Sequence, residues 1–192
     1  MGFRVADAVA TRRWPPVNGA PFPFMKSLPI SIAVAVLLLL EADCGKKREI
    51  TSLQRKEAAS LLSEAQFALT LRDLARADGL LAKATALCPD AGDSWVSLGS
   101  VRMKLGQRDA ARTAYKQALT AYEDAAAKNK TDAEPVLQQV TVLALLGRVK
   151  EARELADKLP ARFPANRSVR MFAEGRKLER LLADPKFKDV AF

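Results

Sequence analysis

The chain repeats one pattern of small and apolar residues every 34 positions. A first copy spans residues 58–91, a second follows it directly at 92–125, and a third occupies 133–166. A period of this length is typical of stacked supersecondary units, in which each unit packs mainly against its neighbours. The period constrains the fold more tightly than any other feature of the sequence.

Composition indicates that these units are helical. Ala and Leu dominate together with Lys, Arg and Glu, all strong helix formers, whereas runs of alternating β-branched residues are scarce. The chain has 192 residues, of which 49% are apolar, and this is enough to bury a sizeable core. We therefore expect an all-α fold built around a single core.

The second copy carries the pattern most completely. Its bulky and small positions are Trp95, Leu98, Gly99, Gly106, Ala111, Tyr115 and Ala118. The first copy matches at Leu61, Ala65, Ala77, Leu81, Ala84 and Pro89. The third copy matches at Val136, Gly147, Ala152, Ala156 and Pro164. Taken together, the three copies resemble the tetratricopeptide repeat family.

The resemblance implies a right-handed α-solenoid in a domain at residues 51–192. It would contain three tetratricopeptide helix pairs, followed by a capping helix at about 168–183 that covers the last pair. Ser168 is the expected N-cap of this helix. Its apolar stripe would comprise Val169, Phe172, Leu178, Leu181 and Leu182. Beyond the stripe, Phe187 or Phe192 could fold back onto the helix.

Small residues are expected where helices cross closely. Gly99 should face Ala111 within one helix pair, because a glycine allows two backbones to approach. Gly106 can adopt a positive φ and so end the first helix of that pair. Seven extra residues, 126–132, separate the second and third copies, and we expect the preceding helix to run on to about Lys128.

In this family, the inner face of the solenoid forms a groove that binds a segment of a partner protein. Transferred by repeat position, the predicted groove residues are Ala59, Leu62, Gln66, Leu69, Asp93, Val96, Ser100, Met103, Glu134, Leu137, Thr141 and Ala144. Most of them are uncharged, so we expect an apolar or amphipathic partner segment. A clamp for a terminal carboxylate would need Lys and Asn where Leu62 and Gln66 stand, so no such clamp is expected.

The usual ingredients of catalysis are scarce. The chain has no histidine, only 6% aromatic residues and no glycine-rich cluster. Cys88 has no histidine to activate it and precedes Pro89 at a predicted helix end, so an ordinary packed thiol is expected. We expect no enzyme activity, small-molecule substrate, cofactor or metal site.

The N-terminal segment has the pattern of an export signal. Residues 1–24 are expected to be disordered if they are made at all, because translation is expected to begin at Met25. Residues 25–43 combine a basic start with an apolar run that is short for a membrane span. The following sequence resembles a bacterial lipoprotein cleavage region with Cys44 as the lipidated residue, although Glu41 and Asp43 depart from that pattern. Ordinary cleavage, an uncleaved anchor and a buried core helix are the alternatives.

These observations leave three functions in competition. The first is a membrane-tethered adaptor in the bacterial cell envelope, facing the periplasm or the exterior, with a flexible linker at 44–50. The second is a cytosolic or inner-membrane-anchored scaffold. The third is a basic protein that binds an anionic polymer, because the formal net charge is +9. Aromatic residues are not interleaved with the basic ones, so we do not expect nucleic-acid binding.

Overall fold

The computed structural model describes residues 49–192, and the predictions for residues 1–24, for 25–43 and for Cys44 lie outside this range. The described part contains these helices: α2 (Ser52–Thr70), α3 (Leu74–Leu87), α4 (Gly92–Lys104), α5 (Arg108–Lys128), α6 (Glu134–Leu145), α7 (Val149–Arg162), α8 (Arg167–Glu174), α9 (Lys177–Ala183) and α10 (Pro185–Lys188). No strand occurs between residues 49 and 192, so this part of the chain is all-α. None of these helices is long and apolar enough to span a membrane.

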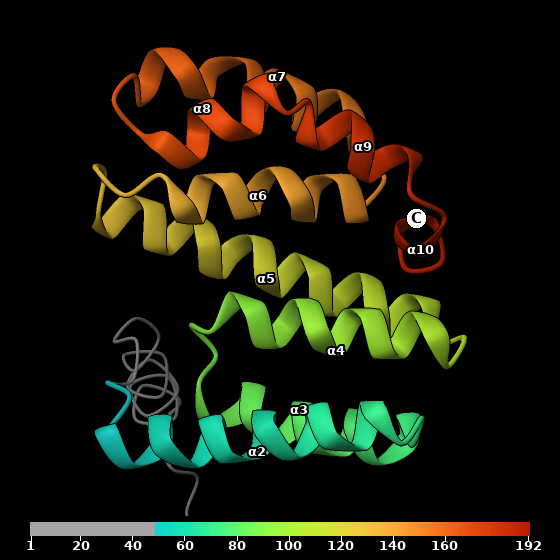
Figure 1. Ribbon diagram of the computed structural model, residues 1–192. Coiled ribbons are helices and arrows are strands. Elements are labelled where there is room, and N and C mark those ends of the chain that lie inside the picture. Colours follow the sequence, from blue (N-terminus) through green and yellow to red (C-terminus); the bar gives the residue numbers. More distant parts are fainter. Residues whose placement is uncertain (1–48) are drawn as a thin grey trace, which may run out of the picture. The chain divides into compact units, whose positions relative to one another are not determined.

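The helices form a repeat-like stack in which contacts run mainly between neighbours in sequence. Each of α2, α4 and α6 packs against the helix that follows it, and α3 and α5 also contact the next helix pair. Figure 1 shows this progression, from α2 and α3 at one end of the stack to α7 and α8 at the other. Helices that follow one another in the sequence therefore pack as neighbours.

Three equivalent turns join the two helices of each pair. Arg72, Gly106 and Gly147 occupy the same repeat position and have φ values of 59°, 75° and 74°. Just after each turn, a backbone N–H donates to the carbonyl five residues earlier: Asp73 to Ala68, Gln107 to Arg102 and Arg148 to Leu143. This bond satisfies a carbonyl at the helix end and is the Schellman type of C-cap. The sequence period thus corresponds to a repeated backbone geometry.

Small residues are fully buried where the helices meet, as the pattern predicts. They are Ala65, Ala77, Ala84, Ala111 and Ala118. Gly99, however, lies against an aromatic ring and not primarily against Ala111. A Cβ added to it would come within 2.3 Å of the Tyr115 ring. The glycine therefore makes room for a large side chain of the partner helix.

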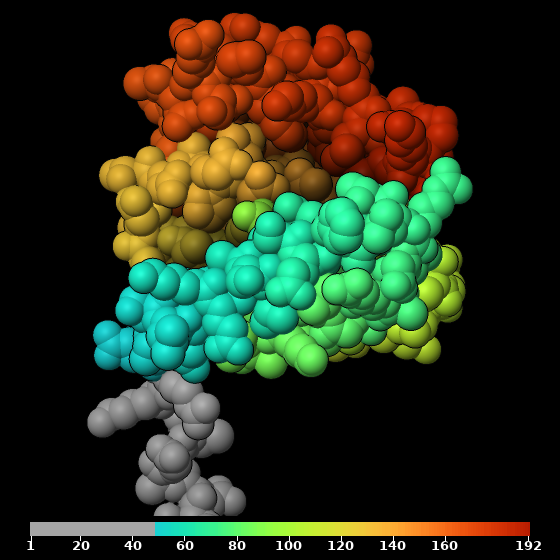
Figure 2. Space-filling view, turned by 60° about the horizontal axis from the view of Figure 1, so that its bottom comes forward, coloured from blue at the N-terminus to red at the C-terminus, as the bar shows by residue number. Residues whose placement is uncertain are grey.

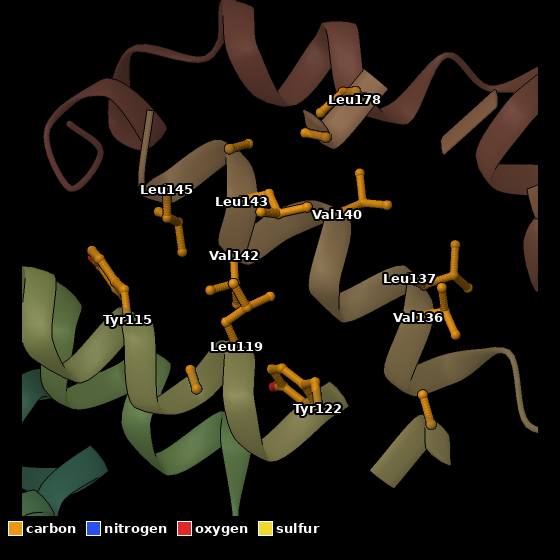
Figure 3. Packing of buried hydrophobic residues seen from close by; sticks show 14 of the residues in the cluster. Tyr115, Leu119, Tyr122, Val136, Leu137, Val140, Val142, Leu143, Leu145 and Leu178 are labelled. Carbon is orange, nitrogen blue, oxygen red and sulfur yellow. The ribbon is translucent and has the colours of Figure 1, made fainter. Parts of the chain in front are cut away.

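The largest part of the core lies between α5 and α6 and extends to the helices that follow. Figure 3 shows Leu119 and Tyr122 of α5 beneath Val142 and Leu143 of α6, with Leu178 of α9 on the other side of α6. As predicted, α5 continues to Lys128, so its last turns can pack against α6. A second cluster joins α2, α3 and α4 through residues such as Leu81 and Leu98.

The predicted single helix at about 168–183 is interrupted. Helix α8 ends at Glu174, and α9 begins at Lys177 after Arg176, which has a φ of 47°. A residue in the left-handed region cannot continue a helix, so the chain changes direction there. The N-cap also differs from the prediction, because the side chain of Asn166, and not Ser168, accepts from the Val169 N–H.

Folded structure also begins slightly earlier than predicted. Ile50, expected to belong to a flexible linker, is half-buried against Ala58, Ala84 and Cys88. Thr51 then caps α2: its side chain accepts from the Gln54 N–H at 3.2 Å, and Gln54 accepts from the Thr51 N–H at 2.9 Å. This reciprocal capping box fixes the start of the helix.

Candidate functional site

The candidate site is the face of α2, α4 and α6 that holds the predicted groove residues. Those exposed to solvent are Ala59, Gln66, Asp93 and Glu134. Those half-buried are Leu62, Leu69, Val96, Ser100 and Thr141. Those buried are Met103, Leu137 and Ala144. Figure 2 shows the surface receding between α2 and α6.

A cleft lies between α6 and α8 at one end of this face. It has a volume of about 330 Å³ and is lined by Glu134, Leu137, Gln138, Thr141, Ser168, Met171, Phe172 and Lys177. We call it the α6–α8 cleft. It brings together three of the predicted groove residues, Glu134, Leu137 and Thr141.

A second hollow extends the α6–α8 cleft towards α9. Its volume is about 290 Å³, and it shares Thr141, Phe172 and Lys177 with the cleft. The additional lining residues are Arg180, Leu181 and Asp184. The two hollows together run along one side of α6 and offer apolar and polar surface side by side.

Charged side chains of both signs line the two hollows together with the apolar ones. Glu134 and Asp184 contribute carboxylates, and Lys177 and Arg180 contribute cations. The Gln138 side-chain amide donates to Glu134 at 2.7 Å, which orients that carboxylate. An amphipathic segment could place apolar side chains on Leu137 and Phe172 while its polar groups meet these charges.

Helices α8 and α9 contribute half of the residues that line the α6–α8 cleft, and the sequence analysis did not assign them to a binding site. Phe172 and Leu181 were expected only as part of a capping stripe. Met171 is 53% exposed at the rim of the cleft, whereas Phe172 is half-buried. The adjacent pair Met171-Phe172, with apolar residues facing two directions, was the available signal in the sequence.

Three predicted groove residues are buried, because their side chains are part of the core. Met103, Leu137 and Ala144 belong to the main apolar cluster, although Leu137 also borders the α6–α8 cleft. Val190, Ala191 and Phe192 pack against the same cluster. Transfer by repeat position could not foresee this, because the C-terminal residues lie outside the repeats.

Asp93 is exposed but engaged. Its carboxylate accepts a hydrogen bond from the Tyr122 hydroxyl, which links α4 to α5. The ring of Tyr122 also packs on Gly92, where an added Cβ would lie 2.6 Å away. Burial raises the pKa of Tyr122, and the bond to Asp93 raises it further because the carboxylate disfavours a second negative charge. Asp93 therefore has a structural role.

Cys88 is a packed thiol in this structure. Its side chain is buried, and Sγ lies 3.7 Å from the Gln54 carbonyl, which it contacts as a weak donor. Burial raises the pKa of the thiol and so disfavours the nucleophilic thiolate. Within residues 49–192, no group of three His, Cys, Asp or Glu side chains is placed to hold a metal ion.

A comparison with models of known protein families finds no match, and a comparison with curated protein sequences finds none either.

Proposed function

We propose that the chain is a tetratricopeptide repeat protein that binds a segment of another protein and catalyses no reaction. The observation that carries the proposal is the α6–α8 cleft, in which Leu137, Thr141 and Phe172 combine with polar groups on a face rich in predicted groove residues. The equivalent turns at Arg72, Gly106 and Gly147 support the family assignment. Solenoids of this kind use such extended faces for binding.

The proposal includes a tether. In it, Cys44 carries a lipid after export, so that the binding face lies in the bacterial cell envelope. The support is the signal-like segment at 25–43, with its basic start and apolar run, and the position of Cys44 directly after this segment. Labelling with a radioactive fatty acid tests the tether: Cys44→Ser is expected to abolish the label. A label that persists in Cys44→Ser would contradict the tether and leave the binding face untouched.

Site-specific photo-crosslinking in the source cells tests the binding face. A photoreactive amino acid at Gln66 or Thr141 is expected to crosslink the chain to a partner protein. Ala173 is the matched control, because it is exposed on α8 and does not line the cleft. Equal crosslinking from Ala173, or none from either face position, would contradict the proposal.

A charge substitution at the cleft adds a second test. Met171→Glu places a charge at the rim of the cleft on an exposed side chain, so the fold should tolerate it. It is expected to weaken partner crosslinking from Thr141, whereas Ala173→Glu on the same helix should leave it unchanged. Circular dichroism of both variants checks that their helix content equals that of the parent chain.

A further inference from the structure

The C-terminal residues 185–192, which we call the strap, follow directly after Asp184, which lines the second hollow. The strap leaves α9 and reaches α5 by passing the last turn of α6. In Figure 1 it lies beside the ends of α6 and α5, with α10 forming its single helical turn. Phe187 is buried, whereas Lys186, Lys188 and Asp189 are exposed.

Main-chain atoms make the two polar contacts that hold the end of the strap. The Phe192 N–H donates to the Leu145 carbonyl at 2.9 Å. The Val190 carbonyl accepts from the Tyr115 hydroxyl at 2.8 Å. Since Tyr115 gives its one proton to Val190, the Ser100 hydroxyl donates to the Tyr115 oxygen, 3.3 Å away. Both contacts to the strap are independent of its side chains.

The specific part of the contact is the ring of Phe192. It meets the Tyr115 ring edge to face, with the centroids 6.3 Å apart. The guanidinium carbons of Arg112 and Arg108 lie 4.3 Å and 5.1 Å from its centroid, on the first turns of α5. Such cation–π and edge-to-face contacts favour an aromatic side chain over an aliphatic one.

The main chain of Gly147 lies close to the main chain of Phe192. Gly147 ends α6 with a φ of 74°, and a Cβ added to it would lie 3.0 Å from the Phe192 carbonyl oxygen. A glycine is thus needed here for both the turn and the approach of the strap. The site has a main-chain acceptor at Leu145, a hydroxyl donor at Tyr115, and the guanidinium groups of Arg108 and Arg112 on the ring of Phe192.

We infer that this site recognises an aromatic side chain of a partner segment and that the strap is its internal ligand. The inference rests on the proposed function and specifies the partner segment. One carbonyl of this segment accepts from the Tyr115 hydroxyl, as that of Val190 does, and an aromatic residue follows two positions later, as Phe192 does.

Phe187 anchors the start of the strap in the core, whereas residues 190–192 are half-buried and are held by two main-chain contacts, the Phe192 ring and apolar packing of Val190 and Ala191. A segment that supplies the same groups can replace these last three residues. The partner then competes with residues 190–192 for Tyr115, Arg108 and Arg112.

The effect of the strap on the affinity for a free peptide can be predicted. A tethered segment has an effective concentration on the order of mM, so an untethered copy binds the intact chain poorly. Removing the Phe192 ring weakens the strap without altering the site. A peptide with the sequence of residues 185–192 should therefore bind Phe192→Ala about tenfold more tightly than the parent chain, the factor expected for loss of ring contacts.

The experiment uses the 192-residue chain and this peptide, labelled with a fluorophore at its N-terminus and amidated at its C-terminus. Fluorescence anisotropy measures its dissociation constant for the parent chain and for Phe192→Ala. A second peptide with alanine in place of the final Phe is expected not to bind either protein. Adding Arg112→Ala to Phe192→Ala should reverse the gain, whereas adding Lys116→Ala, one turn further along α5, should not.

Equal affinity of the peptide for the parent chain and for Phe192→Ala would overturn the inference, as would binding that does not need the ring or Arg112. If Phe192→Ala loses helix content, Phe192→Leu replaces it, because leucine keeps the apolar bulk and lacks the ring. If the peptide does not bind as expected but Gln66 and Thr141 still crosslink a partner, the inference is contradicted and the proposed function is not. Peptide binding as expected, with no partner crosslinks, would contradict the proposed function alone.

Discussion

The hydroxyl of Tyr115, in the middle of α5, donates to the carbonyl of Val190 at 2.8 Å. The two residues are 75 positions apart, so this bond joins the second repeat to the strap. Tyr115 is fully buried, and its ring packs against both Gly99 and Phe192. One side chain thus connects the packing of a repeat with the placement of the C-terminal residues.

Tyr115→Phe is expected to release the strap while keeping the core. The ring stays, but the Val190 carbonyl and the Ser100 hydroxyl lose a partner. Loss of one hydrogen-bonding group with partners left behind costs about 1–2 kcal/mol. Urea denaturation should show this loss, and hydrogen exchange of the Phe192 amide should accelerate. Ser100→Ala is the control, because it removes one contact of Tyr115 and leaves the bond to the strap.

Two glycine-to-alanine variants should change stability in opposite directions. Gly99→Ala would drive a methyl group to within 2.3 Å of the Tyr115 ring, an overpacking that costs about 1–3 kcal/mol. Gly79→Ala lies inside α3 with nothing within 4 Å, so it should stabilise the chain by about 0.5–1 kcal/mol. Thermal and urea unfolding of both variants checks the pair. A stabilised Gly99→Ala would contradict the close contact.

The repeats could be predicted from sequence because they impose local, recurring demands. Gly106 and Gly147 mark turns that need a positive φ, and the fully buried alanines mark helix crossings. The end of α5 at Lys128 was predictable for the same reason, since turn-prone residues follow it. The third turn could not be predicted in this way, because an arginine such as Arg72 does not indicate the left-handed backbone that it adopts.

The candidate site was only partly predictable, because half of it depends on the non-repeating end of the chain. Repeat phase pointed to Leu137 and Thr141, but the cleft also needs Phe172 and Lys177, which lie beyond the repeats. The predicted capping helix breaks at Gly175 and Arg176. Gly175 is the C-cap of α8, and this glycine was a signal in the sequence that the single predicted helix passed over. The sequence did indicate that Phe187 or Phe192 folds back, and both pack in the apolar cluster that contains Leu178. The contact of the strap with Tyr115 of α5 could be located only in three dimensions.

The equivalent turns give a test of backbone strain. Arg72 has a φ of 59° where the other two repeats have glycine, and a left-handed residue with a Cβ costs roughly 1–2 kcal/mol. After the entropy cost of glycine, Arg72→Gly should stabilise the chain by about 0.5–1 kcal/mol. Gly106→Ala is the reciprocal control, because its Cβ would meet nothing within 4 Å and only the strain remains. It should destabilise by about 1 kcal/mol, measured by urea unfolding.

Alkaline pH should unfold the chain through its two tyrosines. Burial raises the pKa of both Tyr115 and Tyr122 in the folded state, and for Tyr122 the Asp93 carboxylate adds to the effect. A raised folded pKa means that the native state holds its protons longer than the unfolded chain. The stability from these groups is therefore fully present below the unfolded pKa of about 10 and is lost as the pH rises above it.

The measurement is a titration that follows tyrosinate absorbance and helical circular dichroism together. Because Tyr115 and Tyr122 are the chain's two tyrosines, the absorbance reports on them alone. Both signals are expected to change in one cooperative transition above pH 10, since ionisation accompanies unfolding. Tyr122→Phe should halve the absorbance change and keep the two signals coincident. Tyrosinate that forms near pH 10 while the helices remain intact would show that these hydroxyls are not held in the core.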